Sequence, residues 1–157
     1  MSAVEFQGLC DAICRQAGIQ TAAVQDYGDG TVALQLQFGD VNVMLAQYAA
    51  NPSLVMALVN FGEPEPHEEL ACWLSLLDVN YHLLGAWPTS FGRSLGAGSA
   101  VLQRSFPLGR ISASDLYLGL LQMTESALQW RTGGYHDAAS APVSAPPVWD
   151  SAAAGLA

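Results

Sequence analysis

The pattern of hydrophobic and polar positions changes its period along the chain, and each period predicts a different element. Residues 2–17 place apolar side chains three and four positions apart, which is typical of an amphipathic helix. Residues 31–38 then alternate between apolar and polar side chains, which predicts a strand with one buried face. The Gly-Asp dipeptide at 39–40 is a two-residue hairpin signal that pairs Phe38 with Val41 and so fixes the register.

Two further strands extend this hairpin into a meander. Turn-forming residues at 26–30 separate the hairpin from a short first strand at about 21–26. An Asn-Pro-Ser turn at 51–53 ends the strand that begins at Val41, and residues 54–61 after it are apolar on both faces. Because the connections are short, the four strands are expected to pair in chain order as an antiparallel meander.

The second half of the chain combines two helices with a pair of strands. Pro66 suits the first turn of a helix that runs to about Leu84, and the apolar stripe of this helix is too wide for one sheet to cover. Strands are expected near 87–91 and at 100–106, and a last helix opens at Ser112. The sequence therefore predicts an α+β fold, an antiparallel twisted sheet with three helices in the order helix, strand meander, helix, strand pair, helix.

Length and composition indicate one folded domain followed by a tail. The chain has 157 residues and a mass of 16.6 kDa, which fits a single domain. We expect this domain to span residues 1–134. Residues 135–157 are rich in Ala, Ser and Pro and carry only two charges, which predicts a disordered tail.

The charge balance excludes several classes of function. Asp and Glu number 14 against 5 basic residues, giving a formal net charge of −9, which opposes binding to nucleic acid or to an anionic membrane surface. All five basic residues are Arg, so neither Schiff-base chemistry nor a P-loop lysine is available. We find neither a signal peptide nor a membrane-spanning stretch, so a cytoplasmic location is expected.

Residues that could carry chemistry are scattered. Cys10 and Cys14 could form part of a metal site with His67 or Cys72, but one imperfect pair is a weak match to zinc spacing, so buried thiols are favoured. The histidines stand beside no nucleophile motif, and the glutamates at 63–69 fit a solvated loop and a helix start. We therefore predict no catalytic residues, no cofactor and no metal.

Three segments add a more specific signal. Residues 76–81 end a helix with the pattern LL-x-x-N, residues 100–108 form a strand that leads to a proline, and residues 112–131 form a helix with a terminal aromatic. Together with the element order, small size and acidic charge, they resemble class I type III secretion chaperones of the Tir-chaperone-like family. The resemblance implies a cytoplasmic homodimer that binds the N-terminal segment of a secreted effector in extended form and keeps it soluble and secretion-competent, without catalysis and with the secretion apparatus as a further partner.

The chain has more apolar side chains than one core requires, and the surplus ones are candidates for contact surfaces. The outer sheet face and the rim of the first helix suit an extended segment, and Met adapts to varied ligands. The candidates for effector binding are Phe6, Leu9, Met44, Tyr48, Met56 and Leu58. The candidates for a two-fold interface on the central helix are Trp73, Leu76, Leu77 and Tyr81. For each residue the alternative is that it fills the core.

Two other functions remain open at this point. An acidic, non-catalytic inhibitor or immunity protein could mask a folded basic partner, and its affinity would then fall steeply with salt. A small enzyme could use His67, His82 or Cys72, and it would need a closed pocket that joins one of them to a second polar group.

Overall fold

A computed structural model describes residues 3–20, 23–83, 89–94 and 96–133 of the chain. The expected tail at 135–157 lies outside these residues. The helices and strands, in chain order, are α1 (Ala3–Ala17), β1 (Gln25–Asp26), β2 (Val32–Phe38), β3 (Val41–Gln47), β4 (Leu54–Gly62), α2 (Glu69–Leu83), β5 (Thr89–Arg93), β6 (Ala100–Pro107) and α3 (Ala113–Gly133).

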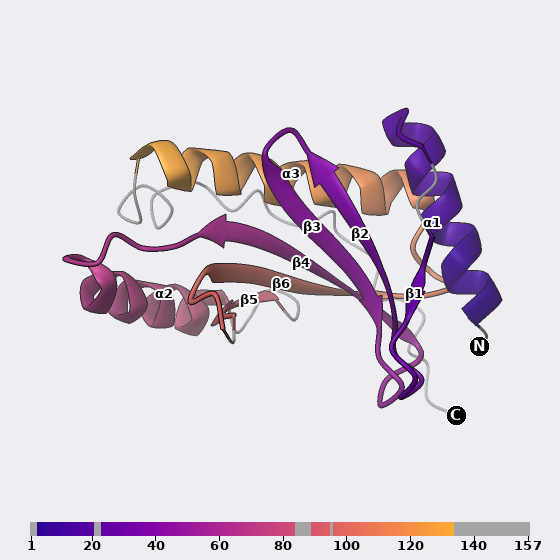
Figure 1. The fold of residues 1–157 in the computed structure, drawn as a ribbon, viewed down its shortest axis with the longest axis horizontal. Coiled ribbons are helices and arrows are strands. Elements are labelled where there is room, and N and C mark those ends of the chain that lie inside the picture. Colours follow the sequence, from indigo (N-terminus) through magenta and orange to yellow (C-terminus); the bar gives the residue numbers. More distant parts are fainter. Residues whose placement is uncertain (1–2, 21–22, 84–88, 95, 134–157) are drawn as a thin grey trace, which may run out of the picture.

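The strands form one six-stranded antiparallel sheet in the order β1-β2-β3-β4-β6-β5. Helix α3 crosses the sheet over β3 and β4 and packs against α1, whereas α2 lies beside the edge strand β5 (Figure 1). The predicted α+β fold with three helices and a four-strand meander is therefore confirmed. The final strand pair joins the meander through β6, which leaves β5 at the edge.

The register carries one row of apolar side chains across five strands. Phe38 pairs with Val41, as the Gly-Asp turn predicted. The row that packs toward α1 and α3 continues this register, and its members on β2, β3, β4 and β6 are buried. In sheet order the row is Leu36, Val43, Val59, Leu102 and Phe91. Alternation along each strand thus gives the core a single face of the sheet.

Some predicted boundaries differ from the structure. Helix α2 begins at Glu69, and residues 66–68 form a turn in which Glu68 N donates to Glu65 O at 2.9 Å, so Pro66 precedes the helix. The first strand is shorter than predicted, with two described residues in the sheet. The strand expected near 87–91 spans Thr89–Arg93, and residues 84–88 lie outside the described part.

The start of α3 follows the sequence signal. The Asp115 backbone N–H donates to Ser112 Oγ at 3.1 Å, and this hydroxyl donates to the Asp115 carboxylate at 2.6 Å. The cap satisfies one of the backbone donors that a helix leaves free at its first turn. The negative charge of Asp115 at the N-terminus also complements the helix dipole.

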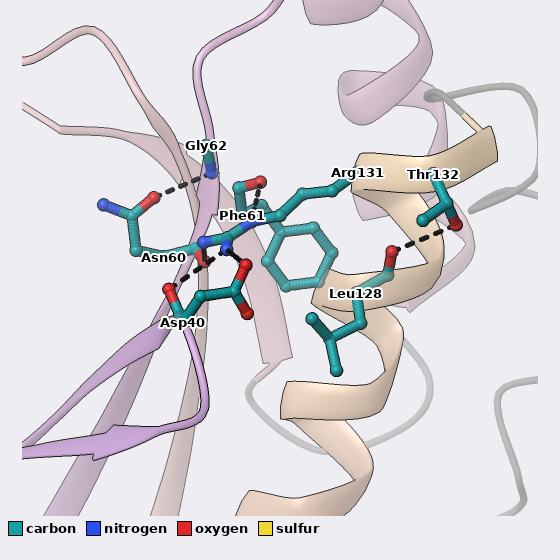
Figure 2. Close-up of polar contacts among 7 residues, drawn as sticks. All are labelled: Asp40, Asn60, Phe61, Gly62, Leu128, Arg131 and Thr132. Carbon is teal, nitrogen blue, oxygen red and sulfur yellow. Dashed lines mark hydrogen bonds and ion pairs between the residues drawn. The ribbon is translucent and has the colours of Figure 1, made fainter.

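The other end of α3 is fixed to the sheet by one side chain. The Arg131 guanidinium donates from Nε to Phe61 O at 3.1 Å, from Nη2 to Asn60 O at 2.9 Å and from Nη1 to Asp40 O at 3.2 Å (Figure 2). Its Nη1 also lies 3.5 Å from the Asp40 carboxylate. The acceptors belong to the β2–β3 turn and to an irregularity in β4 between Asn60 and Gly62. Arg131 therefore holds together three segments that are far apart in sequence.

We expect Arg131→Met to lower the free energy of unfolding by about 1.5–3 kcal/mol, because hydrogen bonds from a charged donor to backbone carbonyls are lost. Urea denaturation followed by circular dichroism measures this change. Arg110→Met is the matched control, since Arg110 is exposed and its side chain makes no hydrogen bond or ion pair with the described residues. Equal stability of the two variants would contradict the role assigned to Arg131.

Candidate functional site

The sheet face that points away from α1 and α3, named here the open face, carries no charged side chain on its described strands. This absence is notable in a chain with a net charge of −9. The described helices pack on the other face or beside β5. By strand alternation and register, the open face consists of Gln25, Ala33, Gln35, Gln37, Asn42, Met44, Ala46, Leu54, Met56, Leu58, Asn60, Ser90, Gly92, Val101, Gln103, Ser105 and Pro107.

Two rows of side chains build the centre of the open face. The first row is Gln35, Met44, Leu58, Gln103 and Ser90, so a Met–Leu pair lies between amide side chains. Side chains directly opposite in such a row have Cβ atoms about 4.5–5.5 Å apart, which makes the apolar patch continuous. Gln103 Nε2 donates to Ser90 Oγ at 2.6 Å, which orients the polar border of the patch.

The second row places Ala46 opposite Met56 and Met56 opposite Ser105. The two methionines and Leu58 are half-buried, whereas Tyr48, just beyond the end of β3, is 37% exposed. The structure thus brings four of the predicted effector-binding residues to one side of the sheet. They form an accessible apolar surface without a helix of the described part over it.

The two candidates on α1 do not join this surface. Phe6 is fully buried in the core with Cys10 and Ile13, so its prediction as a binding residue is wrong. Leu9 is partly buried and packs against the same core, on the side of the sheet that α1 and α3 cover. The apolar stripe of α1 packs against α3, which explains why Phe6 and Leu9 face the core rather than the open face.

Sequence reasoning missed the contribution of β6 to the open face. Gln103 lies opposite Leu58, and Val101 lies opposite Asn60. The alternation at 100–106 showed which residues share a face of this strand. The local sequence could not show which strands lie beside β6, because β6 inserts between β4 and β5.

The two edges of the sheet differ. On β5, the Asn80 side chain replaces a neighbouring strand: its Nδ2 donates to Phe91 O at 3.0 Å, and Phe91 N donates to its Oδ1 at 2.6 Å. On β2, the two-residue strand β1 pairs only with Val32 and Ala33. The rest of the β2 edge has no neighbouring strand among the described residues. The β5 edge is therefore capped at Phe91 by a side chain, whereas most of the β2 edge is unpaired among the described residues.

Helix α2 is apolar on two sides, and only one of them faces the fold. Its inner side carries Cys72 and Leu76, which are buried in the core. Its outer side carries a stripe with spacings of four, three and four residues, named here the α2 stripe. The members of the α2 stripe are Leu70, Leu74, Leu77 and Tyr81, exposed by 73%, 55%, 63% and 73%.

The predicted interface residues divide between these two sides. Leu77 and Tyr81 belong to the exposed stripe. Leu76 is only 3% exposed, so its prediction as an interface residue is wrong and it is a core residue instead. Trp73 is half-buried, with the guanidinium of Arg93 6.0 Å from its ring centroid and its Nε1 donating to Glu69 at 3.2 Å. It therefore packs beside β5 rather than in the α2 stripe.

The cysteines are buried, as predicted. Burial raises the pKa of Cys10 to about 12, and the neighbouring Cys14 and Asp11 act in the same direction. A thiol with such a pKa stays protonated at neutral pH, so Cys10 is a poor nucleophile and a poor metal ligand. Within the described ranges, no group of three or more His, Cys, Asp or Glu side chains is placed to hold a metal ion.

Of the helices that the structure describes, none combines the length and apolar character required to cross a bilayer.

Several solved structures share this fold. A chain of the ExsC–ExsE complex superimposes with a TM-score of 0.68 at 14% identity, covering 84% of this chain and 96% of that one. A chain of the HopA1–SchA chaperone–effector complex gives 0.57 at 18% identity, covering 85% and 94%. A chain of the heterodimeric ExoU–SpcU complex of the type III secretion system of Pseudomonas aeruginosa gives 0.53 at 18% identity, covering 76% and 92%.

At these identities the similarity establishes a common fold, which also occurs in a chaperone–effector complex and in a complex of the type III secretion system. The fold expected from the sequence resemblance is therefore confirmed. No family model matches the sequence. A search of curated proteins finds no relative either.

Replacing Asn80 tests the closed edge. Asn80→Ala leaves the N–H and C=O groups of Phe91 without their partner, so we expect faster hydrogen exchange of the Phe91 amide and a loss of about 1–3 kcal/mol in stability. Exchange measured by NMR and urea denaturation report the two effects. Asn42→Ala is the control, because the exposed Asn42 side chain makes no described hydrogen bond. Unchanged exchange at Phe91 would contradict the proposed closure.

Proposed function

We propose that this protein is a non-catalytic, cytoplasmic chaperone of type III secretion. It holds the N-terminal segment of a secreted effector in extended form on the open face. The observation that carries this proposal is the uncharged open face, with Met44, Met56 and Leu58 at its centre. Proteins of the same fold occur in a chaperone–effector complex and in a complex of the type III secretion system, which supports the same assignment.

The chemistry of the open face suits an unfolded segment. Ordering a flexible segment costs about 2–5 kcal/mol, which at about 25 cal/mol per Å² is offset by burying roughly 80–200 Å² of apolar surface. Methionine side chains adapt their shape to different ligands. The bordering amides of Gln35 and Gln103 can donate and accept hydrogen bonds, which an extended backbone requires. The free part of the β2 edge offers further backbone groups for pairing.

The same surface disfavours the inhibitor hypothesis. A protein that masks a basic partner is expected to present its acidic residues at the contact. The acidic residues of the described part of the chain lie elsewhere than on the open face. Binding through the open face should therefore depend only modestly on salt.

We further propose that two copies of the chain associate through the α2 stripe. Four large apolar side chains at helical spacing on one exposed helix face are unusual for a monomer. A two-fold axis would pack the α2 stripe of one protomer against that of its partner. The spacing of four, three and four matches the seam of paired helices. On the opposite side of the helix, Leu76 packs in the core and Asn80 binds Phe91. A contact through the α2 stripe therefore leaves the core packing unchanged.

Affinity capture tests the assignment directly. The tagged protein is purified with its bound partner from the cytosol of its source bacterium, and the complex is then treated with a protease. We expect a protected N-terminal fragment of one larger secreted protein. Recovery of an intact folded enzyme, released by moderate salt, would overturn the chaperone assignment and support the inhibitor.

Met44→Asp should reduce partner binding at least tenfold, because a carboxylate would be desolvated beside Leu58. Titration calorimetry with the captured fragment measures the affinity. Leu118→Asp on the exposed side of α3, away from the open face, is the matched control and should bind normally. Equal affinity of the Met44 variant and the wild type would show that the partner lies elsewhere.

Leu77→Glu should convert the dimer to a monomer, since two buried carboxylates would meet across the two-fold axis. Light scattering after size exclusion gives the mass. Leu118→Glu, also at an exposed helical leucine, should leave the dimer intact. A dimer mass for the Leu77 variant, or a monomer mass for the wild type, would contradict the assigned interface.

A further inference from the structure

The end of α3 is bound at one border of the open face. Close to this end, Arg131 donates to Asn60 O at 2.9 Å and to Asp40 O at 3.2 Å (Figure 2). Asn60 belongs to the open face, and Asp40 lies two residues before Asn42, which belongs to it as well. The residues that follow α3, 134–157, therefore start at the rim of this face.

The sequence after α3 contains a stretch that is as free of charge as the open face. Residues 138–149, named here the tail segment, read Ala-Ala-Ser-Ala-Pro-Val-Ser-Ala-Pro-Pro-Val-Trp, and the nearest carboxylates belong to Asp137 and Asp150 on its two sides. Segments that stay unfolded are usually poor in apolar side chains and rich in charge. The tail segment differs from them, because Val148 and Trp149 are apolar side chains that gain from burial.

The tail segment is long enough for the open face. In an extended, proline-rich conformation its residues span about 37 Å at ~3.1 Å each. The open face measures about 20 Å along β4 from Leu54 to Asn60 and about 24 Å across its six strands. Residues 134–137 add up to about 13 Å, which leads the chain around the end of the sheet. The tail segment can thus cross the open face while both flanking aspartates stay in water.

Proline determines which part of the sheet the tail segment suits. Pro142, Pro146 and Pro147 have no backbone N–H, so this segment is poorly suited to pair as an added strand with the β2 edge. Their fixed φ keeps the backbone extended, and their rings can pack against Met44 and Met56. Side-chain contact with the face is therefore favoured over pairing at the edge.

We propose that the tail segment lies along the open face of its own chain when no partner is bound. Attachment makes a weak contact sufficient. Effective concentrations of tethered segments reach the millimolar range, so a segment with a Kd of about 1 mM as a free peptide would occupy the face in roughly half of the molecules. A partner must then displace the tail segment, and this consequence rests on the proposed function.

Methionine NMR tests the contact in the full chain without an effector. Met44 and Met56 lie on the open face, whereas Met123 is buried in the core on the other face. Their methyl groups are isotope-labelled, and the wild type is compared with the double variant Val143→Asp, Trp149→Asp, whose carboxylates would be desolvated on the face. We expect the Met44 and Met56 signals to shift and a soluble nitroxide to relax them about twofold faster in the variant, with Met123 unchanged.

The control variant is Ala152→Asp with Leu156→Asp. It adds the same two charges beyond Asp150 and should leave the methionine signals as in the wild type. Three results would each overturn the proposal: unchanged Met44 and Met56 signals in the first variant, an equal response to the control variant, or a response that disappears on dilution, which would indicate contact between copies.

The captured effector fragment separates this proposal from the proposed function. The Val143 and Trp149 double variant should bind the fragment about two- to tenfold more tightly, because fewer molecules have an occupied face. Unchanged affinity of this variant, while Met44→Asp still weakens binding, would overturn the tail contact alone. If Met44→Asp leaves binding unchanged while the methionine signals respond to the double variant, the effector site is wrong and the tail contact stands.

Discussion

Strand β4 is apolar on both faces, but the described helices pack on only one of them. Val55, Ala57 and Val59 complete the core under α3, and Met56 and Leu58 point the other way. Because side chains alternate along a strand, a change of register by one residue would exchange these two faces. The register is fixed by the Gly-Asp turn and by Arg131, which binds the turn and the irregular end of β4 together. This register therefore decides which side chains of β4 enter the core and which lie on the open face.

The distribution of charge matches the difference between the covered face and the open face of the sheet. A chain with 51% hydrophobic residues and an apolar sheet face that no described helix covers is prone to self-association. Its net charge of −9 counteracts this tendency, because like-charged molecules repel one another. The described acidic residues lie outside the open face, so repulsion between copies coexists with an uncharged sheet face.

Local sequence patterns predicted the helices and strands well. They could not predict contacts between segments that are far apart in the sequence. Alternation at 31–38 and the turn at 39–40 gave the correct register, and Ser112 gave the start of α3. The inner and outer sides of α2 could not be distinguished, since the helix is apolar nearly all round, so Leu76 was assigned to the surface. The Asn80–Phe91 bonds, which orient this helix, join segments whose proximity no local pattern encodes. Arg131 and Asp40 are 91 residues apart, which is equally beyond local reasoning.

The closed edge at β5 also bears on polymerisation. Fibrils grow when each added molecule offers a fresh strand edge to the next one. The Asn80 carboxamide occupies the backbone groups of Phe91 at the middle of the β5 edge, which leaves the β2 edge as the better site for such growth. Two molecules that joined through their β2 flanks would present capped flanks outward. Strand-to-strand addition through this edge would then stop at a pair of sheets.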